Sequence, residues 1–169
     1  MNVIETERLA LRQLAPGDAE FILRLLNEPS FLRFIGDRGV RTLDDAGRYI
    51  ASGPVASYEA HGFGLWLVEL KDSDVPIGIC GLLKREALPD VDIGFAFLPQ
   101  FWSMGYAFES ASAVKEFGIG VLGLTRLVAV TNPENDGSIR VLERLGLRFE
   151  RMVRLTDEAP EVKLFAFDT

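Results

Sequence analysis

The chain has 169 residues, 48% of them hydrophobic, which suits one well-buried domain over residues 1–169 and is short for two. Its 18 basic and 25 acidic residues give a formal net charge of -7. This is the wrong sign for a protein that holds nucleic-acid phosphates with basic side chains, so we expect no nucleic-acid partner. An acidic surface suits a cationic partner such as an amine.

No apolar stretch approaches the ~20 residues that span a bilayer, and the first residues show no basic segment followed by an apolar secretory core. We therefore expect a cytoplasmic protein without a membrane partner. Cys80 is the only cysteine, which excludes an internal disulfide and a cysteine metal cluster, and we expect no bound metal. The sequence leaves open whether the protein is a monomer or a homodimer.

The first half of the chain is predicted to combine a strand, a group of helices and a hairpin. Alternating apolar residues predict the strand over residues 3–14. Helices are expected at 16–27, at 28–35, and from the cap residue Thr42 toward Ala60 with an interruption at Gly53 and Pro54. The hairpin joins strands at 63–70 and 76–84.

The second half is predicted to alternate strands with helices. We expect a strand at 91–98, a helix at 105–121, a strand at 126–131, a helix at 135–145, and strands at 147–155 and 162–167. The segment from 91 to 131 makes one right-handed parallel crossover within an otherwise antiparallel series. The fold class is therefore α+β, with a mixed, mostly antiparallel sheet of about seven strands flanked by helices.

The turn after the fourth predicted strand is the most informative segment of the chain. It leads directly into a helix and consists of Ser103, Met104, Gly105, Tyr106 and Ala107. Backbone N–H groups at such a turn face outward at a helix N-terminus, where the dipole favours an anion such as phosphate. The turn lacks the Lys-Ser/Thr ending of a P-loop and the three-glycine dinucleotide fingerprint, so neither of those nucleotide chemistries is indicated.

A second segment follows about thirty residues downstream with helical spacing. It contains Asn135-x-x-Ser138 ahead of a Leu-Gly exit at Leu145 and Gly146. Together with the turn, this segment resembles the acyl-CoA signature of the GNAT superfamily of N-acetyltransferases, in which the turn is written Q/R-x-x-G-x-G/A. The order and spacing of the two segments match that pattern.

Aligned on the GNAT pattern, Gly105 takes the fourth position, Ala107 the sixth, and Trp102 stands where most members have Arg or Gln. Ser103 departs from the glycine that is common in relatives. The form Trp-x-x-Gly-Tyr-Ala and the opening at residues 5–12 are similar to the subgroup related to RimJ and RimL, which acetylate the amino termini of ribosomal proteins and which also includes small-molecule acetyltransferases.

The resemblance implies a GNAT fold in which the fourth and fifth strands splay apart and hold the pantetheine of acetyl-CoA between them. It also implies that a backbone N–H near Phe97 or Leu98 polarises the thioester carbonyl. Asn135 either caps its helix or hydrogen-bonds the pantetheine amide. The expected contacts with the cosubstrate are Phe97, Leu98, Ser103, Met104, Gly105, Tyr106, Ala107, Asn132, Asn135 and Ser138.

Two side chains are candidates for proton transfer. Asp92 occupies the strand position where many relatives carry a Glu, so it is expected to act as a base, directly or through water, or else to be a solvated or Arg-paired carboxylate. Leu142 stands where members often have a Tyr acid, which leaves Ser138 either as the acid or as a cofactor contact.

These patterns predict an acetyl-CoA-dependent N-acetyltransferase whose acceptor is a primary amine, either a protein amino terminus or a small molecule. Direct attack of the amine needs no metal and no covalent enzyme intermediate. The alternative is an acyl-CoA-binding module of the same fold with a sensing or assembly role. Possible acceptor-site residues are Phe34, Tyr58, Glu59 and Trp66.

Overall fold

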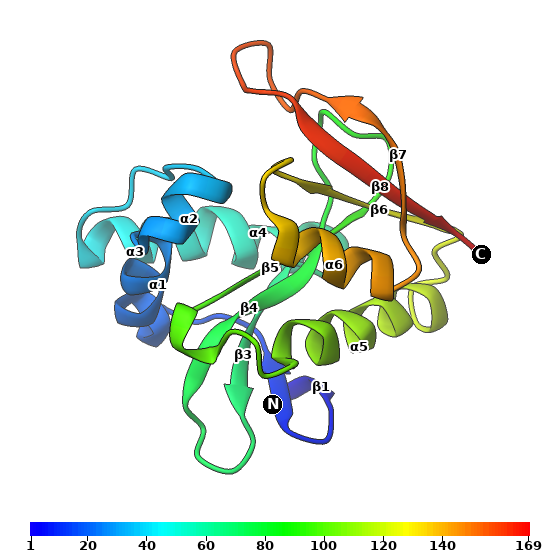
Figure 1. Ribbon diagram of the computed structural model, residues 1–169. Coiled ribbons are helices and arrows are strands. Elements are labelled where there is room, and N and C mark those ends of the chain that lie inside the picture. The colour runs from blue at the N-terminus through cyan, green and yellow to red at the C-terminus, as the bar shows by residue number, and fades with distance from the viewer.

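The computed structural model describes residues 1–169 and shows a single mixed sheet with helices on both faces (Figure 1). The sheet has eight strands in the order β1-β2-β3-β4-β5-β6-β8-β7. The strands are β1 (Asn2–Glu5), β2 (Leu9–Arg12), β3 (Leu65–Leu70), β4 (Pro76–Leu83), β5 (Asp92–Phe97), β6 (Arg126–Thr131), β7 (Arg148–Val153) and β8 (Val162–Asp168). The helices are α1 (Ala19–Leu26), α2 (Pro29–Phe34), α3 (Leu43–Ile50), α4 (Ala56–His61), α5 (Tyr106–Gly120) and α6 (Asp136–Arg144).

The sequence prediction of one strand over residues 3–14 is wrong in one respect, because this segment folds back on itself. The Thr6 N–H donates to the Leu9 carbonyl at 2.9 Å, and this turn separates β1 from β2, which then pair antiparallel. The sheet therefore has eight strands instead of about seven. The other predicted strands and helices lie within a few residues of their expected positions.

Helix α3 begins with the predicted cap. The Thr42 side chain accepts from the Asp45 N–H at 3.0 Å, and the Asp45 carboxylate accepts from the Thr42 N–H at 3.2 Å, which forms a capping box. The expected interruption at Gly53 and Pro54 is present. Helix α3 ends at Ile50, and the chain passes through a π-helical turn, Ala51–Val55, which accommodates the missing N–H of proline before α4 starts.

Alternating strand residues build a separate core on each face of the sheet. On one face Trp66, Cys80 and Ile93 pack with residues of α5 and α6. On the other face Leu67 and Ile79 pack with residues of α1, α2 and α3. None of these helices is long and apolar enough to cross a lipid bilayer.

The parallel neighbours β5 and β6 separate along their length, as the resemblance implies. They share a single partner pair, Asp92 with Val128, whereas β4 pairs with β5 from Gly78 and Phe97 to Leu83 and Asp92. Beyond Asp92 the strands therefore diverge toward their C-terminal ends. The opening is bordered by the turn into α5 on one side and by the turn into α6 on the other (Figure 1).

Candidate active site

The turn between β5 and α5 has the backbone conformation of an anion cradle. Ser103 and Gly105 both adopt left-handed backbone angles, with φ of 63° and 84°, and Gly105 is the residue before the first turn of α5. No backbone N–H from Ser103 to Phe108 donates to another atom of the chain. These groups lie at the N-terminus of a helix on an exposed turn, so they are free to bind a phosphate.

The conformation of Ser103 carries a cost that glycine avoids. A non-glycine residue in the left-handed region is destabilised by about 1–2 kcal/mol of conformational strain. Glycine avoids this strain, but it loses more backbone entropy on folding, which offsets part of the gain in stability. We therefore expect Ser103→Gly to stabilise the protein by about 1 kcal/mol or less, with CoA affinity retained. Chemical denaturation monitored by fluorescence measures the difference. A destabilised variant would show that the Ser103 side chain contributes more than its backbone strain costs.

Trp102 closes the turn against the end of β5. Its indole Nε1 donates to the Phe97 carbonyl at 2.9 Å, although 47% of the residue remains exposed. Trp102 thus anchors one edge of the turn while much of its ring stays in solvent. Phe101 is more enclosed and its ring lies 6.5 Å from that of Tyr106.

The backbone of β5 presents unused N–H groups to the opening. The Leu98 N–H donates to the Ile77 carbonyl at 3.0 Å, so it is part of the β4–β5 ladder and cannot polarise a thioester. Because N–H directions alternate along a strand, those of Phe95 and Phe97 point toward β6, where the single pair at Asp92 leaves them without a strand partner. Sequence reasoning named Leu98 in place of Phe95, since the register of the ladder is visible only in the structure.

Asp92 lies at the point where β5 and β6 diverge. It is 1% exposed, and both of its carboxylate oxygens lie 3.2 Å from Nε of Arg85, which the sequence reading did not single out. Burial raises the pKa of the Asp92 carboxyl above its ordinary value, while the charge and hydrogen bonds of Arg85 oppose this shift. The arrangement holds a carboxylate of increased basicity at the base of the opening.

In the turn from β6 into α6, the side-chain carbonyl oxygens of Asn132 and Asn135 accept hydrogen bonds from the backbone. The Asn132 Oδ1 accepts from the Glu134 N–H at 2.8 Å, and the Asn135 Oδ1 accepts from the Ser138 N–H at 3.2 Å, so Asn135 caps the helix. Neither Nδ2 group has a partner in the chain, which leaves both free to donate to amide carbonyls of a ligand.

Ser138 and Leu142 differ in their availability. The Ser138 hydroxyl is half-buried on α6 and makes no hydrogen bond within the chain. Leu142 is 1% exposed and packs in the core formed with α5, so this residue offers no proton donor to the opening. Ser138 is therefore the hydroxyl that α6 offers near the Asn135 cap.

Two of the four suggested acceptor-site residues are structural. Tyr58 is buried, its hydroxyl accepting from the Leu14 N–H at 3.1 Å and donating to the Leu65 carbonyl, and Trp66 lies in the core.

The other two suggested residues are not buried. Glu59 is exposed on α4, and Phe34 lies on α2 beneath the guanidinium of Arg33. An ion pair of 3.3 Å between Arg33 and Glu134 joins α2 to the turn into α6.

An opened mixed sheet with an unpaired N–H turn at the end of its splayed strand is the arrangement that the resemblance to GNAT acetyltransferases implies. The chain belongs to the acetyltransferase (GNAT) domain family, whose model matches residues 8–148. It is 31% identical over 153 residues to the uncharacterized N-acetyltransferase YoaA of Bacillus subtilis (strain 168), covering 90% of this chain and 86% of that protein. The chain is accordingly an acetyl-CoA-dependent acetyltransferase.

Solved structures share the same fold. An acetyltransferase from Agrobacterium tumefaciens str. C58 superposes with a TM-score of 0.83 at 25% identity, covering 98% of this chain and 94% of that one. The ribosomal L7/L12 alpha-N-protein acetyltransferase RimL, solved in complex with coenzyme A, superposes with a TM-score of 0.84 at 15% identity, covering 99% and 98%. This likeness in fold agrees with the resemblance to the RimJ/RimL-like subgroup.

Proposed function

We propose that this protein transfers the acetyl group of acetyl-CoA to a primary amine by direct attack of the amine on the thioester. The observation that carries the proposal is the run of unpaired backbone N–H groups from Ser103 to Phe108, placed where β5 leaves the sheet. An anion held there directs the remainder of an extended ligand along the opening between β5 and β6. The family and its named N-acetyltransferase relatives support this assignment.

The remaining residues of the opening fit the same substrate. The free Nδ2 groups of Asn132 and Asn135 are suited to the amide carbonyls of pantetheine, and the N–H groups of Phe95 and Phe97 are suited to a thioester carbonyl. Acetyl-CoA supplies an activated acetyl group with a thiol as its leaving group. Much of the acceleration then comes from holding donor and amine in line, so few catalytic side chains are needed.

In this scheme two side chains transfer protons. Asp92, with its raised pKa, removes a proton from the incoming ammonium, directly or through one water. Ser138 supplies a proton to the departing thiolate, because its hydroxyl is free of other hydrogen bonds. No metal and no covalent enzyme intermediate is required.

The acceptor is either a protein amino terminus or a small amine. The formal net charge of -7 favours a cationic acceptor of either kind. A non-catalytic acyl-CoA-binding module is the alternative function, and the observation in its favour is that buried Leu142 occupies the place of the Tyr acid. Turnover separates the two functions, since both retain CoA binding.

The decisive experiment measures thiol release from acetyl-CoA with a panel of small amines and amino-terminal peptides. Acetylated product identified by mass spectrometry would establish the transfer and its acceptor class. Binding of CoA by calorimetry without turnover on any acceptor of the panel would favour the binding module. Absence of CoA binding would remove both.

Ser138→Ala tests the proposed acid once an acceptor is known. A general acid typically contributes 10²–10⁴-fold, but a thiol is a good leaving group, so we expect kcat to fall roughly tenfold to a hundredfold. KM for acetyl-CoA should change little, because the contact forms mainly in the transition state. Steady-state kinetics measure both constants. A raised KM with unchanged kcat would reassign Ser138 to cosubstrate binding.

A further inference from the structure

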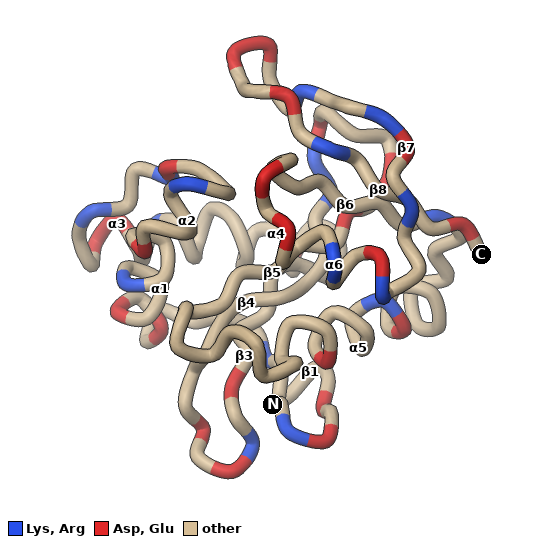
Figure 2. Tube along the Cα trace, in the orientation of Figure 1, with Lys and Arg blue, Asp and Glu red and all other residues tan.

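The cradle lacks a basic side chain of its own. No Lys or Arg occurs between Arg85 and Lys115, and Trp102 holds the first position of the turn pattern. Figure 2 shows the same segment, from β5 to the start of α5, without a basic residue. A pyrophosphate bound there would meet only backbone dipoles unless another segment contributes a cation.

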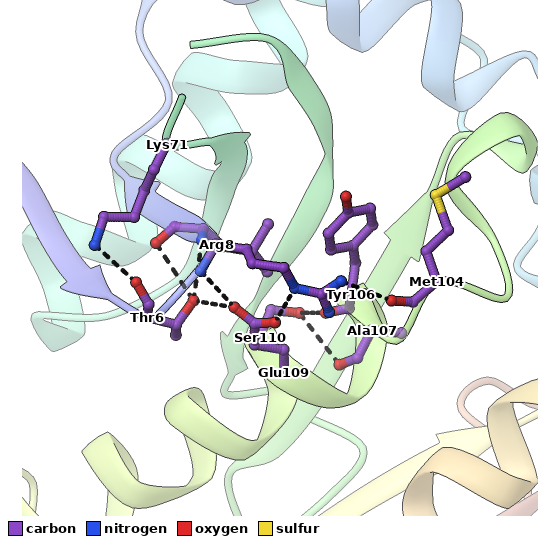
Figure 3. A network of polar contacts seen from close by, with 9 residues as sticks. Thr6, Arg8, Lys71, Met104, Tyr106, Ala107, Glu109 and Ser110 are labelled. Atoms are coloured by element: carbon purple, nitrogen blue, oxygen red, sulfur yellow. Dashed lines mark hydrogen bonds and ion pairs between the residues drawn. The ribbon is translucent and has the colours of Figure 1, made fainter. Parts of the chain in front are cut away.

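Arg8, from the turn between β1 and β2, lies against this loop. Its Nη1 donates to the Met104 carbonyl at 3.0 Å, and its guanidinium stacks on the Tyr106 ring at 4.4 Å from the ring centroid. A Cβ atom built on Gly105 would lie 3.2 Å from Nη2 of Arg8. Figure 3 shows the side chain reaching across to Met104 and Tyr106. The guanidinium therefore contacts Met104 and Tyr106 and lies close to Gly105 between them.

Glu109 in the first turn of α5 holds Arg8 in this position. Its Oε1 accepts from Arg8 Nε at 2.7 Å, and its Oε2 accepts from the Arg8 backbone N–H at 2.9 Å and from the Thr6 hydroxyl at 2.6 Å. Lys71 adds a further bond to the Thr6 carbonyl at 2.8 Å. Burial works to raise the Glu109 pKa, but the bonds from Thr6 and Arg8 prevail and hold the pKa below its ordinary value. The carboxylate is thus ionised at neutral pH.

Peptide geometry converts the Arg8 contact into an orientation of the cradle. In a planar trans peptide the carbonyl of Met104 and the N–H of Gly105 point in opposite directions, and the chain has no cis peptide bonds. With the Met104 carbonyl directed at Arg8, the Gly105 N–H must point away from Arg8, where it is exposed and unpaired. A cationic donor on the carbonyl also polarises the peptide and strengthens its N–H as a donor.

We propose that Arg8, held by Glu109, is a positioning residue that aims the Gly105 N–H at the pyrophosphate of CoA. This inference rests on the proposed function, and it assigns a contribution to CoA binding to a residue on the side of the turn opposite to the ligand. Arg8 does not touch the ligand in this arrangement. Its effect reaches the cosubstrate through the orientation and polarity of one peptide group.

Arg8→Ala is expected to weaken CoA binding about tenfold, the loss of one charge-assisted orienting bond. Arg8→Lys keeps the charge, but lysine lacks the planar guanidinium that donates to Glu109 and to the Met104 carbonyl at the same time. The CoA affinity of this variant should therefore remain reduced severalfold. The matched control is Arg12→Ala, because Arg12 lies in β2, close to Arg8 in the chain. This change removes an ion pair of 2.9 Å with Asp18 and one of 3.2 Å with Glu69. It should lower Tm without changing CoA affinity.

Titration calorimetry with CoA is combined with NMR order parameters of the backbone amides of residues 103–107 in the ligand-free protein. We expect lower order parameters in this segment for Arg8→Ala and not for Arg12→Ala. Unchanged CoA affinity in Arg8→Ala, or full recovery in Arg8→Lys, would overturn the positioning role. Absence of CoA binding by the wild-type chain would instead overturn the proposed function, and the order parameters would still decide whether Arg8 orders the turn.

Discussion

Gly105→Asp should reduce CoA affinity by at least about a hundredfold, since placing like charges together costs several kcal/mol. Three features of the structure act together at this position. The backbone φ of 84° disfavours any side chain, a Cβ atom would approach Arg8 Nη2 at 3.2 Å, and the added carboxylate would bring a negative charge to the turn and compete with the Met104 carbonyl for Arg8. Titration calorimetry with CoA measures the loss, with circular dichroism to confirm that the variant is folded.

Gly123→Asp is the matched control for this variant. Gly123 has a φ of 71° and no atom within 4 Å of a Cβ built on it, and it lies in the turn between α5 and β6. The control therefore shares the left-handed strain and the added charge but not the location. Equal CoA affinity in folded Gly105→Asp and Gly123→Asp would contradict the assignment of the cradle, whereas loss only in Gly105→Asp would support it.

Local patterns were sufficient to predict most elements of the fold. The capping residue Thr42, the glycine after Leu145 and the apolar periodicity of β6 each depend on neighbours within a few positions, which the sequence displays directly. The turn into α5 was predicted for the same reason. The division of residues 3–14 into two strands was missed because a short turn at Thr6 leaves the alternation of side chains almost undisturbed.

Tertiary contacts account for what the sequence did not reveal. Arg85 pairs with Asp92 from a loop, and Arg8 reaches Glu109 across about a hundred residues, so neither pairing follows from spacing. The strand register decides whether the N–H of Leu98 or that of Phe95 is free, and a shift of the register by one residue would reverse the result. Burial of Tyr58 likewise follows from packing of α4 against β2 and β3.

Asp92→Asn should lower turnover by roughly 10² to 10⁴-fold if Asp92 is the base, the range for losing one general base. The variant retains the size of the side chain and removes its basicity. Because burial raises the Asp92 pKa, wild-type activity should fall with decreasing pH at values above those of an ordinary aspartate. The variant should lose the most turnover at pH values between the pKa of Asp92 and that of the amine. In this range the acceptor arrives protonated and the wild-type carboxylate is still ionised.

The control is Asp90→Asn, two residues earlier in the chain. Asp90 is also paired with an arginine, Arg126, at 3.1 Å, but it precedes β5, at the end of the strand opposite to the opening. Its loss should affect stability only, because Arg126 keeps its partners Glu150 and Asp168. Initial rates across pH with a verified acceptor measure both variants. If Asp92→Asn keeps the wild-type rate and pH profile, Asp92 serves only as the partner of Arg85, and water or a substrate group performs the deprotonation.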